Sequence, residues 1–274
     1  MVSVLILTLN EEINLPGCLE SVAWSDDIVV FDSYSTDRTM EIARAAGARV
    51  YQREFDNYAE QRNAALTEVE YKHPWVLMVD ADERWPREIY EEIKTAIRQD
   101  NGVTLYHFRR RDIFLGKWVR RSSGYPTWFG RLVKLGHVSV QREINEEYNT
   151  DGQKGYLQSH FVHYPFNKGV AHWLERHNRY SSMEAKALLK ESRGALRLRS
   201  LFSSDPTLRR KCLKQLAYRM PFRPFLVFFY LYLFRFGILD GIPGLTYCRL
   251  RSIYEYMIDV KVKELRRREK DLPF

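Results

Sequence analysis

The residues best suited to chemistry are three carboxylates that follow a short apolar run. Residues 76–79 read VLMV and lead directly into Asp80, Asp82 and Glu83. An apolar run of this length is typical of a parallel strand that is buried on both faces. Anions crowded at the end of such a strand cost free energy unless a cation lies among them. The motif therefore predicts a divalent metal that carries a phosphorylated ligand. The alternatives are a surface turn, or Asp82 as the cap of the helix that follows.

The elements that must position these carboxylates alternate between strand and helix signals. The predicted strands cover residues 2–8, 27–31, 49–52 and 75–79, and the predicted helices cover residues 10–22, 37–46, 58–71 and 86–99. Alternation at this spacing implies βαβ units, right-handed crossovers and a mainly parallel sheet with helices on both faces. We therefore expect an α/β fold, in which ligands bind outside the carboxyl ends of the strands.

Two more polar clusters follow predicted strands of the same sheet. The first strand ends in Thr8, Asn10, Glu11 and Glu12, and the second ends in Asp32, followed by Ser33, Ser35, Thr36 and Asp37. Each cluster alone suits helix caps, such as Asn10 and Asp37, or a turn. Three clusters at one sheet edge instead predict a binding site. The sequence contains neither G-x-G-x-x-G nor a Walker lysine motif, which argues against a dinucleotide or P-loop site.

Basic residues are concentrated near the C-terminus. The chain of 274 residues has a net charge of +8, and residues 193–270 hold 18 Lys and Arg against 6 Asp and Glu. Such a surface suits nucleic acid, an anionic membrane or an acidic partner. No groove-reading motif is present, so we expect no nucleic-acid partner.

The three cysteines are too few and too scattered for a disulfide framework, which favours a reducing cytoplasm. Residues 1–12 lack a basic n-region, so they predict a strand and not a signal peptide.

Four segments together resemble a known enzyme family. They are TLNEE at 8–12, VVFDSYSTDRT at 29–39, QRNAAL at 61–66 and VLMVDADE at 76–83. Their order and spacing are similar to family 2 glycosyltransferases with the GT-A fold, and the pattern is closest to the lipopolysaccharide-core enzymes of the WaaE (KdtX) type. The resemblance implies an inverting transfer of a hexose from a nucleotide sugar, UDP-hexose, with Mn²⁺ or Mg²⁺ as cofactor.

Carried over position by position, the resemblance assigns roles in a nucleotide-sugar site. Asp82 would bind the metal that bridges the donor diphosphate, and Asp80 would contact the ribose and the metal side. Hard cations prefer carboxylate and phosphate oxygens, which agrees with that assignment. Glu83 would be a further site residue or the structural partner of a nearby Arg. The remaining roles belong to the nucleoside pocket: Thr8, Asn10 and Glu11 would line it, Asp32 would meet the uracil or ribose, and Arg62 would approach the base or brace the pocket.

The acceptor half follows residue 103. We predict strands at 103–111 and 129–135, and the long connection between them contains FLGKWVRRSSGYP at 114–126. The resemblance implies that this loop faces the acceptor. Its Lys117, Arg120 and Arg121 would pair with phosphate on the donor or on a lipid-linked acceptor. Trp118 and Trp128 would stack on a sugar face. The alternatives are a solvated charge run for the basic residues and core packing for the tryptophans.

An inverting transferase needs a base to remove the proton of the attacking hydroxyl, and a carboxylate is the usual choice. The candidate region is QREINEEY at 141–148. Related sequences commonly have a His-Glu pair here, whereas this chain has Asn145 followed by Glu146. We choose Glu146 as the base, with Glu147 as its competitor. Without the resemblance, two adjacent Glu residues before a turn are usually surface residues.

Two histidines occur in SHFVHYPF at 159–166. A strand places His160 and His163 on opposite faces, which argues against a transition-metal site made from both. The resemblance instead implies that His163 and Tyr164 touch the diphosphate or close the pocket. In the helical region beyond, Asn178, Arg179 and Tyr180 match a family element with either a packing or an acceptor role.

The most apolar stretch lies within the basic C-terminal part. Eight of the fifteen residues 222–236 are Phe or Tyr, and the charge-free residues 224–234 number 11. A membrane-spanning helix needs about 20 apolar residues. The flanking arginines therefore favour a segment that lies in the interface, or dips into one leaflet, of an anionic membrane. A buried helix or an oligomer interface is the alternative.

These observations combine into one prediction. Residues 1–167 would form a GT-A catalytic domain, and residues 168–274 a helical, basic and aromatic region that associates with a membrane. The protein would transfer a hexose to a hydroxyl of a lipid-linked saccharide acceptor, either lipopolysaccharide core or a polyprenyl-linked glycan. It would work at the cytoplasmic face of the plasma membrane as a peripheral or monotopic protein. The alternatives are a polyprenyl-phosphate sugar synthase and a non-catalytic, membrane-bound nucleotide-sugar sensor.

Overall fold

The computed structural model describes residues 1–99, 101–141, 147–192, 216, 220 and 222–273. It divides into two compact units. The first comprises Met1–Trp118 and Tyr125–Gly169, and the second comprises Val119–Gly124 and Val170–Phe274. The basic turn at 119–124 belongs to the second unit, although it falls within the predicted first domain, residues 1–167.

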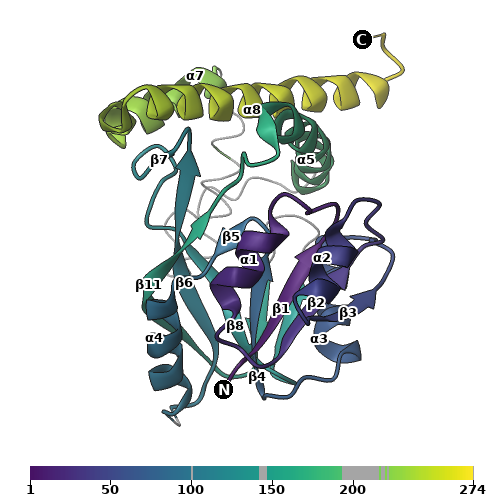
Figure 1. The fold of residues 1–274 in the computed structure, drawn as a ribbon. Helices are drawn as coiled ribbons and strands as arrows, with labels where there is room; N and C mark the ends of the chain where they lie inside the picture. The colour runs from purple at the N-terminus through teal and green to yellow at the C-terminus, as the bar shows by residue number, and fades with distance from the viewer. Residues whose placement is uncertain (100, 142–146, 193–215, 217–219, 221, 274) are drawn as a thin grey trace. The chain divides into compact units, whose positions relative to one another are not determined.

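The first unit is built on a sheet whose first four strands are parallel. In the order β3-β2-β1-β4, they are β3 (Arg49–Gln52), β2 (Ile28–Asp32), β1 (Ser3–Thr8) and β4 (Trp75–Asp80). The predicted strands are confirmed to within one residue at each end. Because these strands run in the same direction, their carboxyl ends meet at one edge of the sheet (Figure 1).

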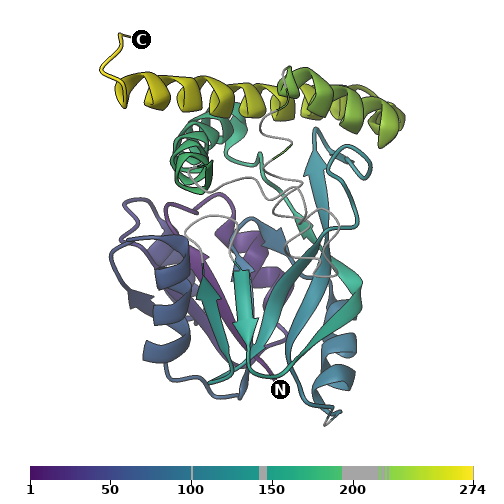
Figure 2. The same ribbon diagram turned by 180° about the vertical axis from the view of Figure 1, so that it is seen from behind.

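Helices cover both faces of this sheet. The helices α1 (Leu15–Val22), α2 (Thr39–Ala45) and α4 (Arg87–Ile97) pack on one face, and α3 (Tyr58–Glu68) packs on the other (Figures 1 and 2). Alternation along β1 explains how both faces become apolar: Val4 and Ile6 join the first core cluster, and Leu5 joins the second. The α/β prediction with a mixed, mostly parallel sheet is therefore confirmed.

Antiparallel pairing extends the sheet on its other side. The added strands are β8 (Trp128–Lys134), β6 (Val103–Phe114), β11 (Gln153–His163) and β5 (Glu83–Arg84), with β7 (Lys117–Trp118) paired to β6. Only the β6 and β11 pair among them is parallel. A separate two-stranded sheet consists of β9 (Val138–Gln141) and β10 (Glu147–Thr150).

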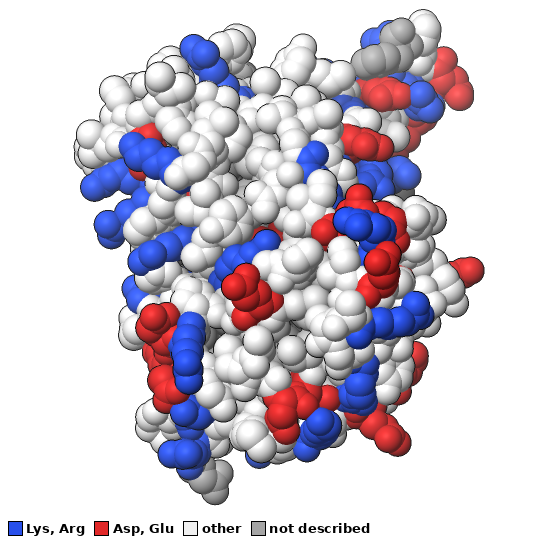
Figure 3. All heavy atoms as spheres, viewed as in Figure 1, with Lys and Arg blue, Asp and Glu red and all other residues white. Residues whose placement is uncertain are grey.

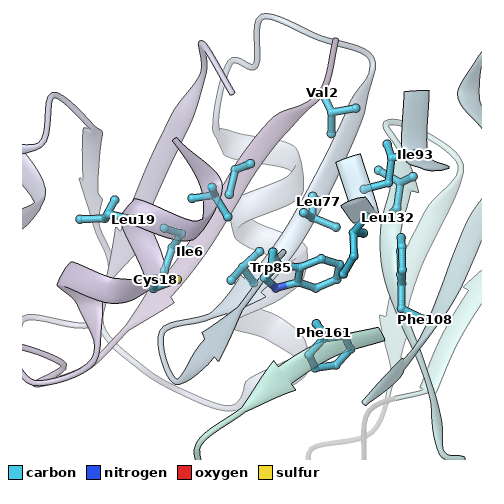
Figure 4. Packing of buried hydrophobic residues seen from close by; sticks show 14 of the residues in the cluster. Val2, Ile6, Cys18, Leu19, Leu77, Trp85, Ile93, Phe108, Leu132 and Phe161 are labelled. Carbon is cyan, nitrogen blue, oxygen red and sulfur yellow. The ribbon is translucent and has the colours of Figure 1, made fainter. Parts of the chain in front are cut away.

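Trp85 anchors the short strand β5 to the core. Its fully buried indole stacks on the ring of Phe161 from β11, with the ring centroids 4.8 Å apart (Figure 4). It packs edge to face with Phe108 from β6, at a centroid distance of 5.1 Å. Burying an aromatic ring of this size contributes a few kcal/mol, roughly 2–3. The packing therefore fixes the chain directly after Asp80 and Asp82, which limits where these carboxylates can lie.

The second unit is helical. Its elements are α5 (Gly169–Ser192), α7 (Arg223–Phe229), the π-helix η2 (Tyr230–Phe234), the 3-10 helix η3 (Gly237–Asp240) and α8 (Gly241–Arg268). No single helix in the described part of the chain is long and apolar enough to cross a membrane. One bent pair of helices is long and apolar enough by length and composition when its two parts are taken together. The parts are Arg223–Phe234 and Gly237–Arg268, with a bend of 71° between them.

Candidate functional site

Asp80, the last residue of β4, lies between two arginines. Its Oδ1 accepts a hydrogen bond from Arg62 of α3 at 2.9 Å, and its Oδ2 accepts one from Arg131 of β8 at 2.6 Å. Burial alone would raise the pKa of Asp80, but the two guanidinium groups outweigh it and hold this pKa well below its usual range. Asp80 is therefore ionised and neutralised by fixed positive charge.

Glu83 completes this cluster and is fully buried. Its Oε1 lies 2.5 Å from Arg131 Nη2, and its Oε2 accepts a hydrogen bond from the Asp80 amide at 3.2 Å. Burial raises the pKa of Glu83, and the charge of Asp80 adds to that rise. Of the two roles considered for Glu83, the structure supports structural pairing with an arginine. We call Arg62, Asp80, Glu83 and Arg131 the arginine cluster.

Asp82 faces a different partner. Its Oδ2 lies 3.3 Å from Nε2 of His163, and the other ring nitrogen, Nδ1, lies 2.6 Å from Asp112 Oδ1. Burial opposes protonation of His163, but the carboxylates of Asp82 and Asp112 outweigh it and raise the pKa of His163 to about 9. Asp112 itself pairs with Arg110 at 2.9 Å. We call Asp82, His163 and Asp112 the histidine cluster.

The histidine cluster fits a hard divalent cation that shares its coordination sphere with a ligand. A carboxylate oxygen and an imidazole nitrogen converge there, while Asp112 holds the opposite ring nitrogen, as acceptors behind metal-bound histidines do. No group of three or more His, Cys, Asp or Glu able to hold a metal occurs among the described residues. Mg²⁺ and Mn²⁺ sites with one or two protein ligands are completed by water and phosphate oxygens. Asp82 and His163 would hold the ion, and the proton on Nε2 would leave when it binds.

The polar residues that follow β1 and β2 bind one another. Asp32 is fully buried and accepts hydrogen bonds from Thr8 Oγ1 at 2.8 Å and from the Ser35 amide at 2.8 Å. Asn10 has a φ of 54°, and its Oδ1 accepts a hydrogen bond from the Thr36 amide at 2.7 Å. These bonds preform the loops at the sheet edge. The nucleoside-binding roles assigned to Thr8, Asn10 and Asp32 stay predictions.

The predicted helix at residues 10–22 begins later than expected. The helix α1 starts at Leu15, and Asn10 is not its cap, because Asn10 adopts a left-handed conformation and its amide group ties together the loops after β1 and β2. Asp37 does bind the start of α2, since its Oδ1 accepts a hydrogen bond from the Thr39 amide at 3.0 Å. The early part of the predicted helix is therefore a loop at the candidate site.

Glu11 is paired across the first unit with Lys168. The Lys168 ammonium lies 2.6 Å from Glu11 Oε1, and Asn14 donates to Glu11 Oε2 at 2.8 Å. Burial raises the pKa of Glu11, although the lysine opposes the rise. This ion pair holds the segment after β11 against the loop after β1. Lys168 was not predicted as a site residue, because no local pattern links it to the TLNEE segment.

Three consecutive residues of α3 connect the site to its surroundings. Gln61 donates to Ser33 Oγ at 3.0 Å, and Arg62 binds Asp80 in the arginine cluster. Asn63 exchanges two hydrogen bonds with the backbone of Val140, at 2.9 and 2.8 Å. Successive helix positions point about 100° apart, so one turn reaches three elements. The QRN sequence thus braces the loop after β2, the end of β4 and strand β9.

The chosen catalytic base, Glu146, lies outside the described residues, as does Asn145. Its competitor, Glu147, begins β10 opposite Gln141 of β9 and is exposed. The assignment of the base therefore stays a prediction. The Asn63 bonds to Val140 nevertheless fix the strand that leads into this segment.

The basic loop is divided between the two units. Lys117 lies in β7 of the first unit and is exposed, whereas Arg120 and Arg121 are exposed residues of the second unit. The tryptophans are half-buried and contact arginines: Trp118 lies 4.5 Å from the Arg111 guanidinium, and Trp128 lies 5.6 Å from that of Arg109. The phosphate and sugar contacts assigned to this loop stay predictions.

Tyr164 follows His163 and is fixed by the turn after β4. Its amide donates to the Asp82 carbonyl at 2.9 Å, and its ring lies 5.5 Å from the Arg84 guanidinium. Arg84 in turn lies close to Gly17 of α1, where a Cβ atom would stand 2.7 Å from Nε. A side chain at this position would therefore have to displace the Arg84 guanidinium. Arg84, like Asp112, was not predicted as a site residue.

Comparison with known proteins identifies relatives of the chain. It is 28% identical over 204 residues to an uncharacterized glycosyltransferase of Rickettsia typhi, covering 70% of this chain and 69% of that protein. It is 23% identical over 272 residues to the lipopolysaccharide core biosynthesis glycosyltransferase LpsC of Rhizobium meliloti, covering 95% and 91%. Among solved structures, glucosyl-3-phosphoglycerate synthase from Mycobacterium tuberculosis is 23% identical with a TM-score of 0.36. That match covers 45% of this chain and 47% of the synthase.

The family model for glycosyl transferase family 2 matches residues 3–170. This range contains β1 to β11, and with them the arginine cluster and the histidine cluster. The resemblance noted in the sequence, and the mixed, mostly parallel sheet expected from it, are both confirmed. The chain therefore belongs to glycosyl transferase family 2.

Proposed function

We propose that this glycosyltransferase moves a hexose from UDP-hexose to a hydroxyl of a lipid-linked saccharide, with inversion and with Mn²⁺ or Mg²⁺ as cofactor. The observation that carries the proposal is the convergence of Asp82 and His163, 3.3 Å apart, at the carboxyl edge of a parallel sheet. Ligands of such sheets bind at this edge. The two side chains leave room in the coordination sphere for a diphosphate.

The acceptor class rests on two further observations. LpsC, which matches along nearly the whole chain, is named as an enzyme of lipopolysaccharide core biosynthesis. The second unit also exposes a large apolar surface, which suits a protein that works on a lipid-anchored substrate at the cytoplasmic face of the plasma membrane. The choice of UDP as the nucleotide rests on the sequence resemblance.

In the proposed reaction, the acceptor oxygen attacks the anomeric carbon as the bond from that carbon to the diphosphate oxygen breaks. UDP leaves with the bonding electron pair, and the hydroxyl proton passes to a carboxylate base. A bound Mn²⁺ or Mg²⁺ would neutralise charge on the leaving diphosphate. Asp82 and His163 would hold the diphosphate end of the donor through that ion. The arginine cluster would keep Asp82 in place, since β4 and β5 flank it.

Glu146 is the proposed base, and its neighbour supplies the control. We expect Glu146→Gln to reduce transfer by about 10²–10⁴-fold, the usual contribution of a general base, while UDP binding is retained. Glu147→Gln removes the same charge one residue away and should change transfer little. A larger loss of transfer in Glu147→Gln than in Glu146→Gln would assign the role of base to Glu147. Undiminished transfer in both variants would contradict a base in this segment.

The acceptor can be tested with membrane lipid extracts. The protein would be incubated with radiolabelled UDP-hexoses, Mn²⁺ and either the extract or a polyprenyl phosphate. We expect the label to stay within an oligosaccharide after mild acid, whether or not that oligosaccharide is released from its lipid, since the new bond is an ordinary glycoside. Label released by mild acid as a free hexose would favour the polyprenyl-phosphate sugar synthase alternative. UDP-hexose binding without transfer to either acceptor would favour the sensor.

A further inference from the structure

The second unit carries an apolar stripe along α7 and η2 that no other described element covers. Residues at helical spacing form it, and their exposed fractions are large: Phe222 77%, Phe225 64%, Leu226 43%, Phe229 48%, Tyr230 53% and Leu233 47%. Side chains three and four residues apart share one helix face, so these rings form a single surface. Contiguous apolar surface of this kind marks an interaction site.

The stripe continues around the bend between η2 and η3. Phe234 is 75% exposed, Phe236 56%, Leu239 63% and Ile242 76%. Phe236 adopts a left-handed conformation with a φ of 59°, and a Cβ at Gly237 would lie 2.6 Å from the Leu231 carbonyl oxygen. The chain therefore turns sharply at this point, and four exposed apolar side chains lie at the bend. We call these four residues the apolar tip.

Buried polar contacts hold the two arms of this hairpin together. Arg223, at the start of α7, is buried and pairs with Glu255 and with Asp259 of α8, the latter at 3.0 Å. Ser252 Oγ also donates to the Pro224 carbonyl at 2.8 Å. These contacts join the start of α7 to the middle of α8, away from the apolar tip. They hold the two helices together and leave the side chains of the tip exposed.

Asp240 joins the hairpin to the basic turn at 119–124. Its buried carboxylate accepts hydrogen bonds from the amides of Arg121 and Ser122, at 2.9 and 2.8 Å, and from Ser122 Oγ at 2.7 Å. The Arg121 guanidinium lies 5.7 Å from the ring of Phe236. A cationic side chain therefore sits directly beside the apolar tip. The surface over α7 and the start of α8 is mostly uncharged, with basic side chains beside it (Figure 3).

We propose that α7, η2, η3 and the first turns of α8 form a re-entrant wedge that enters one leaflet of an anionic phospholipid bilayer, with Arg121 at the level of the lipid phosphates. The arm Arg223–Phe234 has 12 residues. At about 1.5 Å per residue it reaches about 18 Å, short of the roughly 30 Å hydrocarbon core but sufficient for one leaflet. The arginines at 249 and 251 follow the wedge along α8, which matches the negative charge of the headgroup layer. The wedge proposal concerns only where the protein binds, and it does not depend on the proposed glycosyl transfer.

Flotation of the full chain with vesicles, without donor or acceptor, tests the wedge. Wild type should float with vesicles that contain phosphatidylglycerol. The double variant Phe234→Ser with Ile242→Ser should float at least tenfold less, because two exposed apolar side chains leave the membrane. Ile13→Ser, which removes an apolar side chain that is 60% exposed in the first unit, is the matched control and should float normally. Circular dichroism would verify that both proteins are folded.

Two measurements distinguish the wedge from a surface-bound helix. Phe234→Trp should be quenched best by lipids brominated deep in the acyl chain, and quenching only by shallow bromines would overturn re-entry. Arg121→Gln should weaken binding to anionic vesicles by about fivefold, and its effect should vanish without anionic lipid. Failure of wild type to float overturns the proposal, as does a dimer in solution that the double variant dissociates. Neither result bears on transferase activity, which is assayed separately.

Discussion

Only Ala81 separates Asp80 from Asp82, yet the arginine cluster and the histidine cluster compensate their charges in different ways. Both oxygens of Asp80 are bound by arginines, which cannot lose their protons, so its charge is compensated permanently. Asp82 meets a histidine, whose charge disappears when Nε2 loses its proton. The first cluster is complete without a ligand. In the proposed metal site, the second would release the proton on Nε2 when the ion binds.

Burial differs from residue to residue within each cluster. In the arginine cluster, the side chains of Arg131 and Glu83 are 5% and 1% exposed, whereas that of Asp80 is 33% exposed. In the histidine cluster, Asp82 and His163 are 15% and 14% exposed, whereas Asp112 is 5% exposed. What separates the clusters is the buried pair of Glu83 with the permanently charged Arg131, which the histidine cluster lacks. We therefore expect mutations in the arginine cluster to affect stability first and mutations in the histidine cluster to affect metal binding first. Four predictions follow this contrast from the largest expected effect to the smallest.

Asp82→Asn should lower kcat/KM by about a thousandfold or more, because it removes a ligand of the ion that stabilises the leaving diphosphate. The free energy of unfolding should fall by about 1–2 kcal/mol at pH 7, because the Asp82 carboxylate raises the pKa of His163 and its loss removes part of that stabilisation. Titration with Mn²⁺ and urea denaturation measure the two effects. Asp151→Asn removes the carboxylate of another His-Asp pair, with His137 at 2.9 Å, and should leave Mn²⁺ binding intact. Unchanged Mn²⁺ affinity in Asp82→Asn would show that the histidine cluster does not bind the metal.

Arg131→Met should lower the free energy of unfolding by about 3–5 kcal/mol, because it leaves Glu83 buried without its cation. Adding Glu83→Leu should restore part of the loss, since the second change removes the unpaired group. Urea denaturation of the single and double variants measures both effects. Arg38→Met, which breaks an exposed pair with Glu12, should cost less than about 1 kcal/mol. If Arg131→Met were as mild as this control, the arginine cluster would not be structural.

The sequence predicted the sheet edge well because the information there is local. Apolar runs located each of the first four strands, and polar residues directly after them marked the edge. Parallel order then placed the three clusters together without any knowledge of side-chain contacts. The early start given to the helix at residues 10–22 was wrong for the opposite reason. Asn10 binds Thr36, 26 residues away, and no helical periodicity records such a contact.

The partners within the clusters could not be predicted, because they depend on strand register. His163 pairs with Asp112 in the parallel ladder of β11 and β6, and with Glu83 in the antiparallel ladder of β11 and β5. A shift of one residue would turn these side chains to the other face. Nothing in the sequence fixes that register over a separation of 51 residues. The pairing of Arg131 with its two carboxylate partners likewise became evident only from the structure.

Asp112→Asn should weaken Mn²⁺ binding by about 10–100-fold, because His163 loses the charged acceptor that directs Nε2 toward Asp82. The substitution retains the shape of the side chain, so the fold should persist. Nitrogen NMR of His163 supplies a readout besides activity: the population with the proton on Nδ1 should fall in the variant. Weaker Mn²⁺ binding with an unchanged tautomer would mean that Asp112 acts only through packing. In that case the histidine cluster would consist of Asp82 and His163 alone.

Arg62→Gln should have the smallest effect and decides between the two roles given to Arg62. Its side chain is 4% exposed and its Nη2 lies 2.9 Å from Asp80, which favours bracing over contact with the nucleoside base. Because Asp80 retains Arg131, we expect a loss of about 0.5–1.5 kcal/mol in the free energy of unfolding and less than about a twofold change in UDP affinity. Isothermal titration with UDP and urea denaturation measure the two quantities. A large loss of UDP affinity at full stability would place Arg62 against the base, and the arginine cluster would then share ligand binding with the histidine cluster.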